Sequence, residues 1–550
     1  MCLPAHEGAA HAPDVRTALA RHPGQRGSVD WDASAGRAID LAAPKDGAPL
    51  LSGTERIPRD MNRSAVPDPQ PLLSDEAPGP LTPSLAAEIH RVFDAQRGSA
   101  LRLRSSTLEE RLGKLDRLRA GIVAHREDIL QAAAHDLGRP AAESDLAELL
   151  PLLADIAEHR RRLKSWLRPR RVRCTALLLG TRAEVRREPR GRCLILSPWN
   201  YPLVLTLGPL IPALACGNTA ILKPSELAPR CSTVLANIVR ELFDESEVAL
   251  FEGDASVAAA LLELPFDHVF FTGSPPIGAR VMAAAAKHLA SVTLELGGKS
   301  PVIIDETADL ALAVKTLAWT KFLNAGQTCI APDHVYVHAA VHEQVIELFQ
   351  RRVQAWYGGA DALRARDFGR IVNERHAQRL ISLLEDARAR GAGVPCGGEA
   401  DAAQRFVAPT VLTDVPEDAR IMQEEIFGPL LPLIRFRSLD EVIERINRAP
   451  KPLALYIWTK RRDAAERLIA RTSAGGTCIN HAAAQFLHHK LPFGGVNHSG
   501  IGSYHGEWGI RAFSHERAVL ETRVMLARIF FPPYGARVRR LSGLLRRWLS

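Results

Sequence analysis

Short apolar runs alternate with helical stretches from residue 193 onward, and this alternation restricts the fold more than any other feature of the chain. Each run has the length of a strand, and the stretches between runs are long enough for helices. Alternation of this kind predicts an α/β fold, with a parallel sheet covered by helices on both faces. The expected strands are 193–196, 220–222, 248–251, 268–271 and 292–296, with helices ending at Leu214 and spanning 229–243.

The regions around this core differ in composition. Residues 1–81 are rich in Pro, Ala, Gly, Asp and Arg, and Trp31 is their only aromatic residue, so we expect a disordered extension; Met61 is a second candidate start. Residues 82–294 open with amphipathic helices over 84–168 and continue into the sheet. A second αβ region covers 295–478, residues 479–525 return to the first region, and 526–550 form a basic tail.

Charge and cysteine usage argue against several functions. The net charge is +8, but aromatic residues make up only 6% of the chain, so the basic runs indicate solvated surface rather than a nucleic-acid site. The eight cysteines are scattered without Cys-x-x-Cys pairs, which predicts neither a zinc or other metal site nor a disulfide framework. Scattered thiols suit the reducing cytoplasm. We find no apolar run of about 18 residues that would span a membrane and no apolar signal segment at the N-terminus.

A strand followed by a helix start occurs at 270–278. Gly273 ends the apolar run, Ser274 is a good N-cap, and Pro275 suits the first helical position. A helix N-terminus after a strand attracts a pyrophosphate. The segment lacks the Gly-x-Gly-x-x-Gly spacing, and Pro275 and Pro276 each remove an N–H donor, so alone it favours an ordinary turn.

Lys223 and Glu226 follow another strand end and are candidates for binding a ribose. A carboxylate there would repel a 2′-phosphate. A surface turn with an ion pair explains the same residues equally well.

Glu295 and Cys329 are the candidates for chemistry. Glu295 ends an apolar run before two glycines, where an apolar setting would raise its pKa and make it a base; a structural turn is the even alternative. Cys329 lies in a Gly-Gln-Thr turn after a helix over 311–323, and local dipoles or a cation would lower its pKa and make it a nucleophile. An inert core thiol is the alternative, which fits Cys193, Cys216 and Cys478.

The order of these segments along the chain resembles the aldehyde dehydrogenase superfamily, over about residues 190–515. Within it, 327–333, 504–506 and 513–515 look most like the class 3, fatty-aldehyde and coniferyl-aldehyde branch. The segments that carry the resemblance are Pro198-Trp-Asn-Tyr-Pro202, Lys223-Pro-Ser-Glu226, Phe271-Thr-Gly-Ser274, Glu295-Leu-Gly-Gly-Lys299, Gly326-Gln-Thr-Cys329, Glu425-Ile-Phe-Gly-Pro429 and Pro492-Phe-Gly-Gly495.

The resemblance implies a Rossmann-type cofactor domain, an αβ catalytic domain and a bridging arm, from about 172–190 and the region after 479, that forms a homodimer. It implies oxidation of an aromatic or medium- to long-chain aldehyde with NAD, or with NADP. Cys329 would attack the aldehyde, Asn200 and the Cys329 N–H would hold the oxyanion, and Glu295 would activate the hydrolytic water. The implied cofactor residues are Trp199, Lys223, Glu226, Gly273, Ser274, Gly278, Glu425 and Phe427.

Several positions depart from the family pattern. Pro275-Pro276 weakens the pyrophosphate assignment, while Asn480-His481 and Val496-Asn497-His498 replace more frequent residues. We expect the second loop to survive, because Asn tolerates left-handed backbone. Surface positions are the favoured interpretation for His481 and His498, and shaping the mouth of a substrate site is the alternative.

Two rival functions share the fold. A CoA-acylating enzyme is disfavoured because Glu295 supplies a base for water. An inactive relative is disfavoured because the nucleophile, base and oxyanion residues are all present.

The C-terminal segment 532–550 has the pattern of an amphipathic helix. Val538, Leu541, Leu545 and Trp548 recur at three- and four-residue steps among arginines. Packing on the enzyme body or on a partner chain is the favoured interpretation; peripheral contact with a membrane surface and disorder are the alternatives.

Overall fold

The structure is a computed structural model that describes residues 81–175, 178–358 and 367–549. The expected disorder of 1–81 and the alternative start at Met61 therefore lie, apart from Leu81, outside the described residues.

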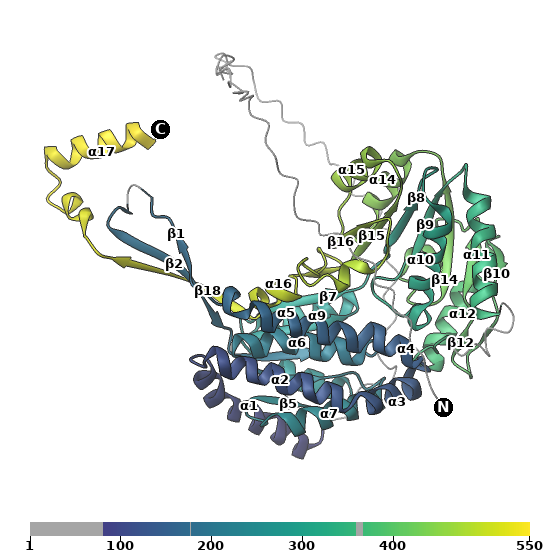
Figure 1. Ribbon diagram of the computed structural model, residues 1–550, viewed down its shortest axis with the longest axis horizontal. Coiled ribbons are helices and arrows are strands. Elements are labelled where there is room, and N and C mark those ends of the chain that lie inside the picture. Colours follow the sequence, from purple (N-terminus) through teal and green to yellow (C-terminus); the bar gives the residue numbers. More distant parts are fainter. Residues whose placement is uncertain (1–80, 176–177, 359–366, 550) are drawn as a thin grey trace, which may run out of the picture. The chain divides into compact units, whose positions relative to one another are not determined.

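The first sheet has six strands in the order β17-β7-β6-β3-β4-β5 (Figure 1). Every neighbouring pair is parallel except β17 with β7. The predicted parallel sheet is confirmed, and the predicted runs agree with its strands to within two residues. The strands are β3 (Arg192–Leu196), β4 (Thr219–Lys223), β5 (Val248–Leu250), β6 (His268–Gly273), β7 (Ser291–Leu296) and β17 (Gly500–Ile501).

Side chains of β3 alternate between two hydrophobic cores, one on each face of this sheet. Cys193 and Ile195 join the core that contains α6, whereas Leu194 and Leu196 join the core that contains α1, α8 and α9. Helices on both faces explain why the strand reads as a continuous apolar run. These helices are α1 (Pro83–Leu103), α6 (Pro202–Cys216), α7 (Pro229–Leu242), α8 (Ala255–Leu262) and α9 (Pro275–Ala286).

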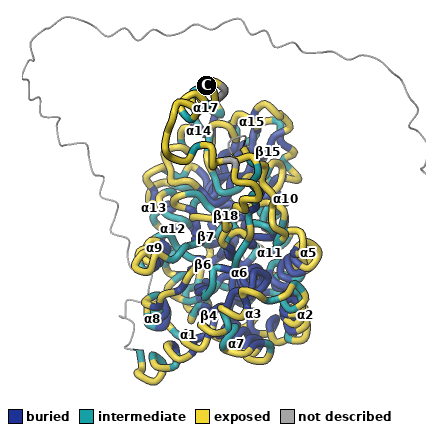
Figure 2. The backbone as a smooth tube through the Cα atoms, turned by 90° about the vertical axis from the view of Figure 1, so that its left-hand side faces the viewer, coloured by how far each residue is buried: buried dark blue, intermediate teal, exposed yellow. Residues whose placement is uncertain are grey.

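The predicted helices over 84–168 are present. They are α1, α2 (Leu108–Ala124), α3 (Arg126–Leu137), α4 (Ala141–Ser144) and α5 (Leu150–Trp166), with a single π-helical segment η1 (Asp145–Leu149) between the last two. Among them α2 and α5 pack against α6, every residue of which is buried. Figure 2 shows this buried interior as dark blue around the α6 label.

The strand order reverses at β3. This first strand of the sheet lies between β4, which follows it, and β6, which returns on its other side. Ligands of open parallel sheets bind outside the carboxyl ends of the strands at such a reversal. Ser197–Asn200 and Ser274 directly follow β3 and β6, Lys223 is the last residue of β4, and Glu295 is the penultimate residue of β7.

The second sheet has seven strands in the order β10-β13-β14-β9-β8-β15-β16, all parallel to their neighbours except β10. Cys329 and Phe427 precede the amino ends of the adjacent strands β9 and β14, which brings their loops together. The strands are β8 (Pro301–Ile304), β9 (His334–His338), β10 (Gly393–Cys396), β13 (Thr410–Thr413), β14 (Leu430–Phe436), β15 (Ala454–Trp458) and β16 (Gly476–Ile479), with β11 (Ala400–Asp401) and β12 (Phe406–Val407) as a separate pair. The helices of this region are α10 (Leu310–Phe322), α11 (His342–Tyr357), α12 (Glu374–Ala389), α13 (Arg420–Gln423), α14 (Leu439–Arg448) and α15 (Arg462–Arg471).

The two segments predicted for a bridging arm pair with each other. Strand β2 (Thr181–Pro189) is antiparallel to β18 (Ser514–Thr522) over the full length of both, and β1 (Arg170–Val172) extends the sheet on the other side of β2. Helix α16 (Gly506–Ala512) leads into β18.

The C-terminal helix is present as α17 (Ala536–Leu549). None of its side chains that the structure describes is buried; Leu544, for example, is 62% exposed. The favoured packing of this helix on the body of its own chain is therefore wrong, while packing on a partner chain stays a prediction. Within the described ranges, no helix combines the length and apolar character needed to cross a bilayer.

Candidate active site

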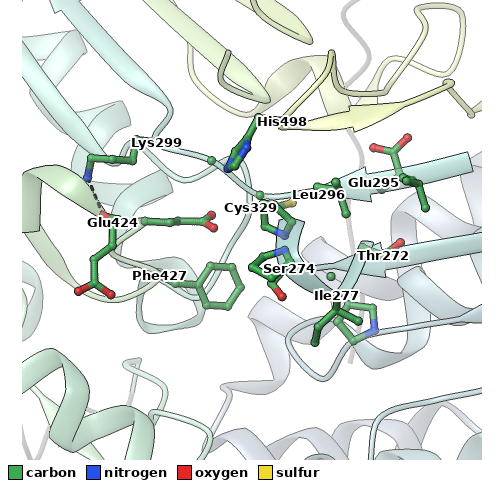
Figure 3. A pocket seen from close by; sticks show the side chains of 18 of the residues that line it. Thr272, Ser274, Ile277, Glu295, Leu296, Lys299, Cys329, Glu424, Phe427 and His498 are labelled. Carbon is green, nitrogen blue, oxygen red and sulfur yellow. Dashed lines mark hydrogen bonds between the residues drawn. The ribbon is translucent and has the colours of Figure 1, made fainter. Parts of the chain in front are cut away.

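A cavity of about 1890 Å³ is lined by the carboxyl ends of β3, β4, β6 and β7 and by loops of the second sheet. Figure 3 shows Cys329 near its middle, with Phe427 on one side and the ends of β6 and β7 on the other. Segments far apart in the sequence thus contribute to one site. The predicted residues that line it are Trp199, Asn200, Lys223, Glu226, Gly273, Ser274, Glu295, Cys329, Glu425 and Phe427.

Gly278 is the predicted residue that does not line the cavity. It lies in α9, and a Cβ atom at this position would come within 2.7 Å of the Leu296 side chain on β7. Its assignment to direct cofactor contact is therefore not supported by its position. The glycine instead lets α9 pack closely on the sheet.

The loop before Cys329 has an unusual backbone. Asn324, Ala325 and Gly326 have φ values of 52°, 51° and 75°. A left-handed alanine is strained, and such strain persists only where the surroundings enforce it. Gln327 does so, because its amide donates to the Asn324 and Arg370 carbonyls (2.9 and 3.0 Å) and accepts from the Val372 N–H (2.9 Å).

The surroundings of the Cys329 thiol raise its pKa. Burial is the largest cause, the nearby Glu425 and Glu295 carboxyls act in the same direction, and the backbone N–H groups of Cys329 and Ile330 oppose them; together they raise the pKa of Cys329 to about 12. The expectation of a lowered pKa is wrong in this state of the protein. Local dipoles do act in the expected direction, but burial and two carboxyl groups outweigh them.

Glu295 is the penultimate residue of β7 and is 3% exposed. Neither of its carboxyl oxygens has a hydrogen-bond partner within the described ranges, and desolvation raises its pKa well above the usual value. The predicted rise in pKa is therefore present. An unpartnered buried carboxyl costs stability, so such a group in a cavity marks a functional site.

Glu425 is a second carboxyl group close to the thiol. Desolvation raises its pKa to about 7, although the Gly298 backbone N–H donates to it and lowers the value. A Cβ atom on Gly297 would lie 2.2 Å from the Glu425 Oε2 atom, so glycine is required for this approach. Lys299 anchors the loop, because its Nζ donates to Asp333 (2.5 Å) and to the Glu424 carbonyl (2.9 Å; Figure 3).

Asn200 follows β3 and is 3% exposed. Its side-chain Nδ2 donates to the Gln327 carbonyl at 3.0 Å, two residues before Cys329. An amide nitrogen has two hydrogens, so the second one is available for an oxygen atom of a ligand beside the thiol.

The residues predicted to bind the cofactor include an aromatic pair and an ion pair. The Trp199 and Phe427 ring centroids lie 5.5 Å apart, edge to face. Lys223 Nζ donates to Glu226 at 2.9 Å, at the rim of the cavity.

Ser274 occupies the predicted N-cap position of α9 but makes no capping bond, so that part of the prediction is wrong. Its buried Oγ and that of Thr272 have no partner within the described ranges. Orphaned hydroxyls beside a helix N-terminus fit the pyrophosphate of a dinucleotide. Pro275 and Pro276 stand at the first helical positions, where an N–H has no partner within the helix.

The two unusual loops keep their shape. Asn480 fixes one through bonds with both Thr459 backbone groups (3.0 and 2.9 Å). Asn497 adopts the expected left-handed conformation and accepts from Lys451 at 2.7 Å. Both histidines are exposed, and His498 lines the cavity (Figure 3).

Sequence reasoning missed two residues behind the site. Arg139 and Glu148 are 1% exposed and form an ion pair that contacts the Asn200 and Asn324 segments. No local pattern marks either residue, because both lie in the region 84–168 that the sequence predicts as amphipathic helices, far from the other motifs.

The sequence pattern of the aldehyde dehydrogenase family matches residues 68–519. The 4,4'-diaponeurosporen-aldehyde dehydrogenase of Staphylococcus aureus is 40% identical over 79% of this chain and 94% of its own. Aldehyde dehydrogenase family 3 member B1 of mouse is 40% identical over 79% and 92%. A substrate-bound Staphylococcus aureus AldH structure has a TM-score of 0.80 and 39% identity, covering 83% of this chain and 99% of that one.

Two further matches concern the cofactor. An aldehyde dehydrogenase from Bacillus cereus, solved as an NAD⁺ complex, has a TM-score of 0.72 and 30% identity over 80% of this chain and 89% of that one. The dimeric NADP-preferring aldehyde dehydrogenase of dog is 38% identical over 79% and 94%.

The chain belongs to the aldehyde dehydrogenase family, in the class 3 branch that the resemblance indicated. It is an oxidoreductase that oxidises small-molecule aldehydes to carboxylic acids with NAD(P).

Proposed function

We propose that the acid is formed by hydrolysis of a thioester on Cys329. Trp199, Lys223, Glu226, Ser274 and Phe427 would hold NAD(P)⁺, which would supply the hydride acceptor. The Cys329 sulfur attacks the aldehyde carbon and forms a thiohemiacetal, whose oxygen accepts from the Asn200 amide. Loss of the hydride leaves a thioester, and water then releases the acid and restores the thiol.

The observation that carries this proposal is that two carboxyl groups with raised pKa values, those of Glu295 and Glu425, line the same cavity as the Cys329 thiol. Cys329 attacks as the thiolate, and its raised pKa means that a neighbouring group must take the proton. Glu295 or Glu425 serves as that acceptor. Glu295 then takes a proton from the attacking water, because its carboxyl oxygens have no partner within the described ranges and can bind that water molecule.

CoA is the rival acyl acceptor. The thiol of CoA needs a weaker base than water does to become a nucleophile. The raised pKa of the desolvated Glu295 carboxyl therefore favours hydrolysis. NADH formation with benzaldehyde or decanal, followed by absorbance with and without CoA, tests the choice. We expect acid as the product and no dependence on CoA; acyl-CoA as the product would establish the rival reaction.

The proposed substrates are aromatic or medium- to long-chain aldehydes. The Staphylococcus aureus relative is named for 4,4'-diaponeurosporen-aldehyde. The cavity that Cys329 lines is also lined by the apolar side chains of Leu205 and Phe427.

We further propose that residues 82–294 and 479–525 form the cofactor domain and 295–478 the catalytic domain. The β1-β2-β18 sheet is the bridging arm of a homodimer, since β1 and β18 are free edges within the described part of the chain and edges invite pairing. The dog relative is named as dimeric. Light scattering at micromolar concentration should give twice the chain mass; a monomer would disprove the assignment.

The location we propose is the cytoplasm, with peripheral membrane contact through α17. Seven cysteines of the described residues are free thiols, which suits a reducing compartment. Arg537, Arg539, Arg540, Arg546 and Arg547 give α17 a basic surface beside exposed apolar residues such as Leu544.

A further inference from the structure

Arg139 lies between α3 and α4 and reaches the back of the active site. Its Nη2 donates to the Asn200 carbonyl and, at 2.9 Å, to the Asn324 Oδ1 atom; its Nε donates to the same Oδ1 at 3.1 Å. One guanidinium therefore contacts the segment that carries the oxyanion amide and the strained loop that leads to Cys329.

Asn324 passes this constraint on. Because its Oδ1 accepts from Arg139, its Nδ2 must face the other way, where it donates to the Asn200 carbonyl (2.9 Å) and the Gln327 carbonyl (3.2 Å). The Asn200 side chain donates to the same Gln327 carbonyl. Asn200 is thus tied to the Cys329 loop both through its backbone carbonyl and through its side chain.

Glu148 holds the other side of the Asn200 segment. One of its oxygens pairs with Arg139, and the other accepts from the Leu203 and Val204 N–H groups (2.7 and 3.1 Å) at the start of α6. Tyr201, the N-cap of α6, makes no capping bond of its own. The buried carboxylate therefore supplies the negative charge that a helix N-terminus favours.

The aromatic ring of Tyr201 completes the cluster. The Arg139 guanidinium lies 4.7 Å from the ring centroid, and the Tyr201 hydroxyl is 2.7 Å from the Thr328 hydroxyl, next to Cys329. Only the planar guanidinium has donors in the directions that all three partners require.

We propose that Arg139 is a positioning residue that holds the Asn200 amide in place for the oxyanion formed at Cys329. This inference rests on the proposed role of Asn200. A misplacement of about 1 Å in such a site costs on the order of 100-fold in rate. A purely structural ion pair would instead affect folding and leave oxyanion stabilisation unchanged.

Two cofactor-free reactions of Cys329 distinguish these roles. Acylation by p-nitrophenyl acetate breaks the ester bond, forms the thioester and releases p-nitrophenolate, and it develops an oxyanion. Alkylation by iodoacetamide forms a thioether and releases iodide, and no oxyanion develops in this reaction. Both rates are measured on the same protein preparations, with the melting temperature recorded for each variant.

Loss of Arg139 should slow acylation alone. For Arg139→Met we expect acylation to fall about 10- to 100-fold, with alkylation within about twofold of the wild type. Arg139→Lys should recover part of the loss. Because Arg139→Met leaves the Glu148 charge unpaired and destabilises the fold, the double variant Arg139→Met/Glu148→Gln repeats the measurement without a buried charge.

A mutant cycle with Asn200 tests the route of the effect. Asn200→Ala should lose about 100- to 1,000-fold in acylation, and adding Arg139→Met should lower the rate little further, since Arg139 acts through Asn200. Lys114→Met is the matched control: Lys114 is a buried cation paired with Glu247 at 2.7 Å. It should cost stability without a selective effect on acylation.

The proposal is overturned if the acylation rate stays near that of the wild type in both Arg139→Met and Arg139→Met/Glu148→Gln, or if the acylation and alkylation rates fall together. It is also overturned if the losses in acylation rate caused by Arg139→Met and Asn200→Ala multiply in the double variant. Failure of the proposed function gives a different result. In that case wild-type protein and Cys329→Ala would be acylated equally, before any Arg139 variant is considered.

Discussion

Replacing Glu295 with Gln should make the protein more stable and much less active. The carboxyl is 3% exposed, has no partner for either oxygen within the described ranges, and has its pKa raised by desolvation. A glutamine of the same shape keeps the packing and removes the ionisable group.

The size of the stability effect depends on pH. An unfolded Glu titrates near pH 4.3, whereas the folded Glu295 titrates well above it. Below both values the group is protonated in both states and contributes nothing. Between them the unfolded chain loses a proton that the folded chain keeps, so the free energy of unfolding of the wild type falls by about 1.4 kcal/mol per pH unit. Glu295→Gln escapes this loss.

Thermal unfolding of both proteins from pH 4 to pH 8 measures the difference. One kcal/mol corresponds to about 1 °C in a folded body of this size. The melting temperatures should therefore coincide near pH 4 and diverge by about 1.4 °C per pH unit above it, with the variant higher. The divergence ends where the wild-type carboxyl ionises.

Activity gives the second half of the prediction. Loss of a general base costs about 100- to 10,000-fold, and here the loss should fall on thioester hydrolysis, so an initial burst of NADH should persist in the variant. A temperature difference that does not change with pH, or a less stable variant, would show that Glu295 is ionised and partnered. Loss of the burst would place Glu295 at an earlier step.

Three further changes test the rest of the site and the tail. Cys329→Ala should abolish aldehyde oxidation and leave the Kd for NAD near normal, because the thiol makes the covalent bond; substantial residual turnover would exclude it as the nucleophile. Glu226→Ser should raise the ratio of kcat/KM for NADP over NAD by about tenfold, equal to about 1.4 kcal/mol, since the carboxylate beside Lys223 repels a 2′-phosphate; an unchanged ratio, or a wild type that prefers NADP, would contradict this. A chain ending at Gly535 should lose salt-sensitive co-sedimentation with anionic vesicles, to which each arginine of α17 adds about 1 kcal/mol; equal sedimentation of both proteins would refute membrane contact.

The sequence alone determined the parallel sheet, its strand positions and the residues gathered at the strand ends. It did so because strand and helix periodicity is local, and because parallel strands bring their carboxyl ends to one edge. Lys223, Ser274 and Glu295 could therefore be grouped without coordinates, and the order of the motifs indicated the family.

Tertiary structure decided what no local pattern carries. Packing removed Gly278 from the cavity and left the Ser274 hydroxyl without a capping bond. Burial, rather than the turn around Cys329, set the pKa of the thiol. Arg139 and Asn324 are separated by 185 residues in the chain, yet they share a hydrogen bond behind the site. A residue's partners and its distance from water depend on contacts between remote segments, and only the folded chain brings those segments together.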